Sequence, residues 1–139
     1  MATISASLVT ASAAIILLLG LIHLLYTFQG QKLHPRDAQL EEKMRQVSPV
    51  LTRETTMWKA WVGFNASHSF GAILFGLIYG YLAIAHDQFL FRAPFLLLVG
   101  LLLLIGYVFL GRRYWFSVPY HGILLACVLY VVALIIRWA

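Results

Sequence analysis

Apolar residues fall in four long runs separated by polar connectors. The runs predict helices over residues 7–28, 57–85, 91–110 and 114–138. About 20 apolar residues in a helix are enough to cross the hydrocarbon core of a bilayer. The pattern therefore predicts an all-α integral membrane bundle of four transmembrane helices, forming a single membrane domain over residues 1–139.

The connector over residues 29–56 is the one long polar stretch. Apolar residues recur in it at helical spacing: Leu33, Leu40, Met44 and Val47. This spacing predicts a short amphipathic connector helix, either at the membrane surface or solvated and packed on its own bundle. Ser48-Pro49 resembles a helix start, with serine as the N-cap and proline at the first helical position. We therefore expect the second long helix to begin before it enters the membrane.

Composition supports the membrane assignment. Of the 139 residues, 62% are hydrophobic and 11% are charged, whereas soluble domains are about 45–50% apolar and about 25% charged. The formal net charge is +5, but Lys and Arg lie where helices should end and do not alternate with stacking aromatics. This distribution argues against nucleic acid as a partner. The one cysteine, Cys127, excludes a disulfide framework and a CxxCH haem attachment.

The basic residues also predict an orientation. Eight of the ten Lys and Arg lie on the side of the first and third connectors. The positive-inside rule then places residues 29–56 in the cytoplasm and both termini outside, in an inner membrane of the cytoplasmic or thylakoid type. No basic residue precedes Lys32, so the first run lacks the start of a signal peptide and is expected to remain as a helix. Gly111-Arg112-Arg113 is expected to form a tight turn.

Three histidines lie inside the predicted spans. His23, His68 and His121 fall about 8, 15 and 11 Å from the inner face at 1.5 Å per residue. These overlapping depths predict that the three side chains converge, with Asn65 and Ser69 as supporting hydrogen-bond partners. Ionisable groups within membrane helices are functional candidates by default. His34 and His86 lie in polar connectors and are expected to be solvated.

Several ligands fit such a set. Three imidazoles can bind a metal ion; histidine can also ligate haem or a chlorophyll-type pigment, or hydrogen-bond a quinone. The cofactor therefore stays open. The structural alternative is that each histidine makes an interhelical hydrogen bond. No HExxH motif, no histidine pair at i and i+4, and no carboxylate within the spans points to catalysis, so a role other than an enzyme is favoured.

Small residues recur at intervals of four along the second long helix. They form two ladders: Gly63, Ser67 and Gly71, and Ala72, Gly76 and Gly80. Ladders of this kind let helix backbones approach closely in lipid. One is expected to serve the bundle itself, and the other is a candidate surface for a membrane partner or a second copy.

The segments GFNASHSFG and RYWFSVPYHG resemble those of small bacterial four-span membrane proteins. The resemblance implies the four-span fold and carries no activity. The chain does not resemble the small multidrug-resistance transporters, whose membrane glutamate in the first helix is missing here.

Three functions are compatible with these features. The favoured hypothesis is a non-catalytic accessory or structural subunit of a membrane complex or homo-oligomer, surrounded by the lipid bilayer. The second is a redox protein that binds a metal, haem, pigment or quinone through its histidines. The third is a small transporter or channel lined by the polar face of the second long helix.

Overall fold

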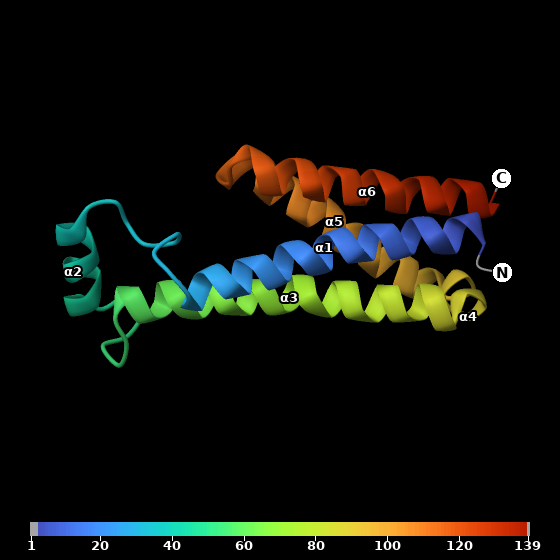
Figure 1. The fold of residues 1–139 in the computed structure, drawn as a ribbon. Coiled ribbons are helices and arrows are strands. Elements are labelled where there is room, and N and C mark those ends of the chain that lie inside the picture. Colours follow the sequence, from blue (N-terminus) through green and yellow to red (C-terminus); the bar gives the residue numbers. More distant parts are fainter. Residues whose placement is uncertain (1–2, 139) are drawn as a thin grey trace. The chain divides into compact units, whose positions relative to one another are not determined.

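The computed structural model describes residues 3–138, which fold into helices joined by short connectors (Figure 1). The helices are α1 (Ile4–Phe28), α2 (Ala38–Gln46), α3 (Met57–Ala85), α4 (Asp87–Phe91), α5 (Pro94–Tyr114) and α6 (Ser117–Trp138). In this part of the chain, four helices are long and apolar enough to cross a membrane: α1, α3, α5 and α6. The predicted all-α membrane class, with a short connector helix, is confirmed.

The start of α3 differs from the expectation. Ser48-Pro49 begins no helix; it lies in a loop that closes where the Met57 N–H donates to the Val47 carbonyl (2.9 Å). The helix begins directly after Thr56, whose hydroxyl accepts a hydrogen bond from the Lys59 N–H (3.4 Å). Threonine is itself a good N-cap, so a second capping residue nearer the apolar run sets the boundary.

The predicted turn at Gly111-Arg112-Arg113 is also wrong. These residues continue α5 to Tyr114, and the chain turns at Trp115, whose backbone is extended. Arginines in the last turn of a helix favour its continuation, because their charge interacts well with the C-terminal end of the helix dipole. A further short helix, α4, was not predicted; it includes Phe91, which is buried.

The described residues form two compact units. One, the core unit, combines residues 3–19 with residues 72–138; the other, the connector unit, is residues 20–71. Helices α1 and α3 contribute to both. The expectation of a single membrane domain stays a prediction.

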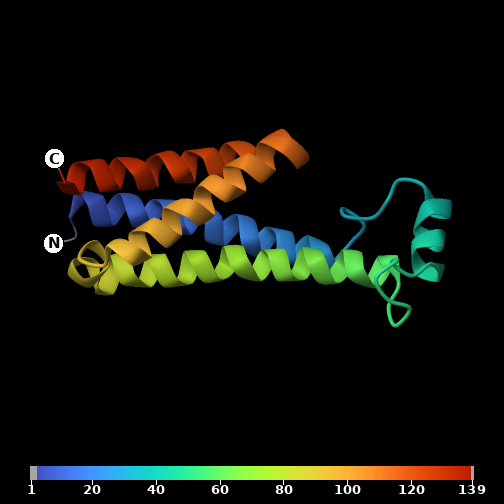
Figure 2. The same cartoon turned by 180° about the vertical axis from the view of Figure 1, so that it is seen from behind.

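The core unit is built around one apolar cluster. Within this unit the first turns of α1 and the end of α6 lie at the same end, and α5 runs obliquely from the α4 end of α3 toward α6 (Figures 1 and 2). All five helices that enter the unit contribute to the cluster, for example Ile16 (α1), Phe75 (α3), Leu90 (α4), Leu104 (α5) and Tyr130 (α6).

Hydrogen bonds from buried hydroxyls to backbone carbonyls link the helices of the core unit. In lipid such groups have no water as a partner, so each must be satisfied within the protein. The bonds run from Ser12 to Ala126 (2.7 Å), from Tyr79 to Leu96 (2.6 Å) and from Tyr130 to Leu97 (3.1 Å).

Gly76 on α3 lies directly against the backbone of α1 in the core unit. A Cβ at this position would come within 2.5 Å of the Leu17 Cβ and 2.8 Å of the Ala13 carbonyl oxygen. One turn on, a Cβ at Gly80 would make ordinary contact with the Ala13 Cβ at 3.6 Å. The backbone contact at Gly76 therefore depends on the absence of a side chain.

We predict that Gly76→Ala lowers the free energy of unfolding by about 1–3 kcal/mol, because α1 or α3 must shift to admit the methyl group. Gly106→Ala is the matched control, since nothing lies within 4 Å of a Cβ at Gly106; helix propensity alone gives no loss and up to about 1 kcal/mol of gain. Circular dichroism during SDS titration of the protein in mixed micelles measures both. Equal stability of the two variants would contradict the close approach.

Candidate functional site

Two of the three histidines that were predicted to converge lie against each other in the connector unit. His23 on α1 and His68 on α3 are both half-buried, and their ring centroids are 5.3 Å apart with an interplanar angle of 88°. The edge of one imidazole therefore faces the plane of the other. This is an aromatic contact between two titratable rings on facing helices.

Asn65 orients the first of these rings. Its amide nitrogen donates to the Trp61 carbonyl one turn earlier (2.8 Å), which leaves the amide oxygen to accept. That oxygen lies 3.0 Å from Nε2 of His23, so Nε2 carries the proton and donates. In the neutral imidazole, Nδ1 then keeps its lone pair. The predicted role of Asn65 as a hydrogen-bond partner of a histidine agrees with this geometry.

The nearby hydroxyls bond to backbone. Thr27 donates to the His23 carbonyl (2.8 Å), and the buried Ser69 donates to the Asn65 carbonyl (2.9 Å). Such bonds to the carbonyl four residues earlier are common for serine and threonine within helices. Ser69 thus donates its hydroxyl proton to the backbone one turn earlier, and its support of a bound cofactor stays a prediction.

His121 belongs to the core unit. It is exposed on α6, with its ring centroid 5.3 Å from that of Tyr120. Its convergence with His23 and His68 stays a prediction. Within residues 20–71, no group of three or more His, Cys, Asp or Glu side chains is placed to hold a metal ion.

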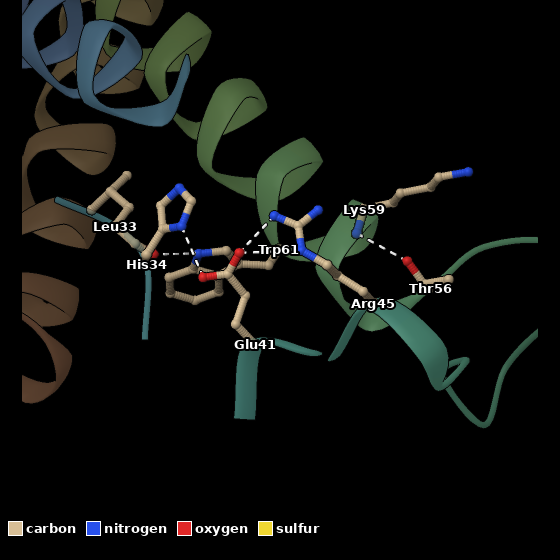
Figure 3. A network of polar contacts seen from close by, with 7 residues as sticks. All are labelled: Leu33, His34, Glu41, Arg45, Thr56, Lys59 and Trp61. Carbon is tan, nitrogen blue, oxygen red and sulfur yellow. Dashed lines mark hydrogen bonds and ion pairs between the residues drawn. The ribbon is translucent and has the colours of Figure 1, made fainter. Parts of the chain in front are cut away.

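A second polar cluster lies in the connector (Figure 3). Nδ1 of His34 is 2.9 Å from one carboxylate oxygen of Glu41, and Arg45 donates to the other from Nε (3.1 Å) and Nη2 (2.6 Å). His34, which was expected to be solvated, is only partly so: its side chain is 28% exposed. His86 is exposed, as expected, with its Nε2 3.1 Å from the Tyr81 hydroxyl.

Two tryptophans of α3 complete this cluster. The Trp58 ring packs against the His34 ring (centroids 4.8 Å apart) and under the Arg45 guanidinium (4.5 Å). The Trp61 indole N–H donates to the Leu33 carbonyl (3.0 Å), as Figure 3 shows. These contacts fix α2 and the segment after α1 to the first turns of α3. We call the set His34, Glu41, Arg45, Trp58 and Trp61 the connector clamp.

A small pocket lies beside the connector clamp. Its volume of about 10 Å³ is enough for one water molecule. The lining residues are Thr27, Leu33, His34, Trp58, Trp61, Val62 and Asn65. Asn65 thus contacts His23 and also borders the pocket that His34 lines.

The chain matches no protein-family model, and no curated protein or solved structure matches it.

The Glu41 carboxylate is held in its ionised form. The hydrogen bond from Arg45, and then that from His34, lower the pKa of Glu41 below its ordinary 4.5. A carboxylate with a lowered pKa stabilises the folded state above its ordinary pKa, and this contribution is lost as the pH falls through the folded-state value.

We therefore predict that the connector clamp opens below pH 4.5 and is intact at neutral pH. An NMR titration of the Glu41 carboxyl carbon should give a midpoint below 4.5. Arg45→Gln should move that midpoint toward the ordinary value by more than His34→Gln does, because Arg45 is the larger cause. Identical midpoints in the three proteins would contradict the clamp.

Proposed function

We propose that this integral membrane protein is a non-catalytic subunit, accessory or structural, that assembles with copies of itself or with other membrane proteins through α3. One observation carries the proposal: the first ladder of small residues presents open surface in the connector unit. Nothing lies within 4 Å of a Cβ built on Gly63, and Ser67, one turn on, is exposed.

The chemistry of this face suits a second helix. Helices associate in lipid by close packing at small residues, because no hydrophobic effect separates them from the apolar lipid tails. The Ser67 hydroxyl donates to the Phe64 carbonyl (3.0 Å), so it needs no partner from another chain. Phe64 and Phe70, which are 76% and 54% exposed, offer apolar area beside the ladder. Gly71 is half-buried at its far end.

The way polar groups are used also supports a structural role. Among residues 3–138, no buried side-chain nitrogen or oxygen of the described set lacks a hydrogen-bond partner. The intramembrane hydroxyls of Ser12, Tyr79 and Tyr130 bond carbonyls of neighbouring helices. Polar side chains that bond to carbonyls of neighbouring helices hold these helices together, and the surface is left to apolar side chains.

We predict that Gly63→Leu weakens assembly at least about tenfold, or about 1.4 kcal/mol. The leucine fills the open face and keeps a partner helix at a distance, while the fold of the single chain is unaffected because the position is open. Native mass spectrometry of the full chain from mild detergent, together with its co-purifying proteins, measures the effect against the 15.7 kDa monomer.

Gly106→Leu on α5 is the matched control, since a Cβ there also meets nothing within 4 Å and Gly106 lies outside both ladders. It should assemble as wild type does. Wild-type protein that runs as a monomer without partners, or a Gly63→Leu variant that assembles normally, would refute the proposal.

The histidine pair favours a second candidate, a protein that binds a cofactor through its histidines. Metal–nitrogen bonds of about 2.0–2.1 Å would set two imidazole centroids on one tetrahedral ion roughly 5 Å apart, close to the observed 5.3 Å. Asn65 already fixes one tautomer, as partners of metal-binding histidines commonly do. A haem, pigment or quinone held by the same imidazoles stays open.

This candidate predicts a stoichiometric metal or chromophore in the purified protein, lost on His23→Ala and on His68→Ala. Absorption spectra and elemental analysis measure it. His121→Ala separates a pair from a triad, because loss in this variant too means that all three histidines bind. His86→Ala, in an exposed connector position, should retain the group. A colourless, metal-free wild type would leave the histidines as interhelical contacts.

A further inference from the structure

The loop before α3 presents two fully exposed aliphatic side chains. Val50 and Leu51 have exposed fractions of 109% and 93%, the highest among the large apolar side chains of the described residues. The loop projects sideways from the start of α3 (Figures 1 and 2). Burying a side chain of this size is worth about 1.5–3 kcal/mol, so this tip favours an apolar neighbour.

Backbone contacts hold the tip in place. The Thr52 N–H donates to the Pro49 carbonyl (3.3 Å), which makes a turn with Val50 and Leu51 at its centre. The Met57 N–H donates to the Val47 carbonyl (2.9 Å) and closes the loop at the start of α3. The tip is therefore presented by an ordered turn whose base is fixed to a membrane-spanning helix.

α3 is longer than is needed to cross the hydrocarbon core, and two tryptophans mark its start. Its 29 residues extend about 43 Å at 1.5 Å per residue, whereas the hydrocarbon core is about 30 Å thick. A helix of this length along the membrane normal has roughly 13 Å, or about nine residues, to divide between its two ends outside the hydrocarbon. Trp58 and Trp61 in the first turns are residues that favour the headgroup level.

Charges beside the tip match a phospholipid surface. Arg53 follows it within the loop and Lys59 lies in the first turn of α3; both are exposed. Glu54 is the acidic neighbour in the same loop, and its backbone N–H bonds to the Thr52 hydroxyl (3.1 Å). Aliphatic side chains flanked by Lys and Arg are the combination that binds membrane interfaces, with apolar groups at the acyl boundary and cations at the phosphates.

We propose that Val50 and Leu51 insert into the headgroup–acyl boundary of the bilayer that the chain itself spans, with Arg53 and Lys59 contacting lipid phosphates. The occupant of this apolar tip is thus lipid of the surrounding leaflet. The inserted loop holds the polar connector between α1 and α3 on the membrane surface, independently of any partner protein at α3.

Site-directed fluorescence tests the insertion in the full chain. In a Cys127→Ala background, Leu51→Cys is labelled with the dye NBD and reconstituted in phosphatidylcholine–phosphatidylglycerol vesicles. Glu42→Cys, at an exposed position of α2, is the matched control. The Leu51 label should emit at shorter wavelength and be quenched several times more strongly by lipids with a nitroxide near the top of the acyl chain.

Two outcomes would overturn the proposal. A Leu51 label with the emission of water and the same iodide accessibility as the Glu42 label would show a solvated loop. Blue-shifted emission without quenching by nitroxide lipids would show that protein, and not lipid, covers the tip. Repeating the measurement with Val50→Cys guards against an effect of one label.

Discussion

The structure depends on the requirement that a polar side chain in lipid find its partner within the protein. In the connector unit the bond between His23 and Asn65 joins α1 to α3 and fixes the histidine tautomer. In the core unit the hydroxyls of Ser12, Tyr79 and Tyr130 meet the same requirement with carbonyls of neighbouring helices. Because water is absent from the hydrocarbon, each of these bonds constrains which helices pack together.

In the polar connector, α2 and the segment after α1 are held to the start of α3 by charge and aromatic contacts. The connector clamp sets an ionised Glu41 between Arg45 and His34, and both of these partners contact the ring of Trp58. Exposed ion pairs contribute little individually, so the ring contacts and the Trp61 bond to Leu33 are as important for its geometry. Asn65 links the histidine pair to the connector clamp, since it bonds His23 and lines the same pocket as His34.

The ranges of the long apolar helices could be predicted from the sequence. The choice between two possible helix starts, and the contacts made by residues in turns, could not. The α3 range of 57–85 matches the prediction because an uninterrupted apolar run has few alternatives in a membrane protein. The helix start predicted at Ser48-Pro49 was wrong because Thr56 offers a second N-cap, closer to the apolar run of α3. The similar depths of His23 and His68 predicted that the two side chains approach each other, and Asn65 was predicted as a hydrogen-bond partner. The contact between His34 and Glu41 was missed because His34 precedes α2, so the fold of the turn before Ala38 decides whether the two side chains meet.

A double-mutant cycle of His23→Leu and Asn65→Leu tests the central claim most directly, that polar groups in the spans hold the helices together. The cycle cancels the bond from Asn65 to the Trp61 carbonyl, which both Asn65 variants lack. We expect a coupling free energy of about 0.6 to 1.7 kcal/mol, the range of interhelical hydrogen bonds in membrane proteins. Additive losses, with no coupling, would contradict the account.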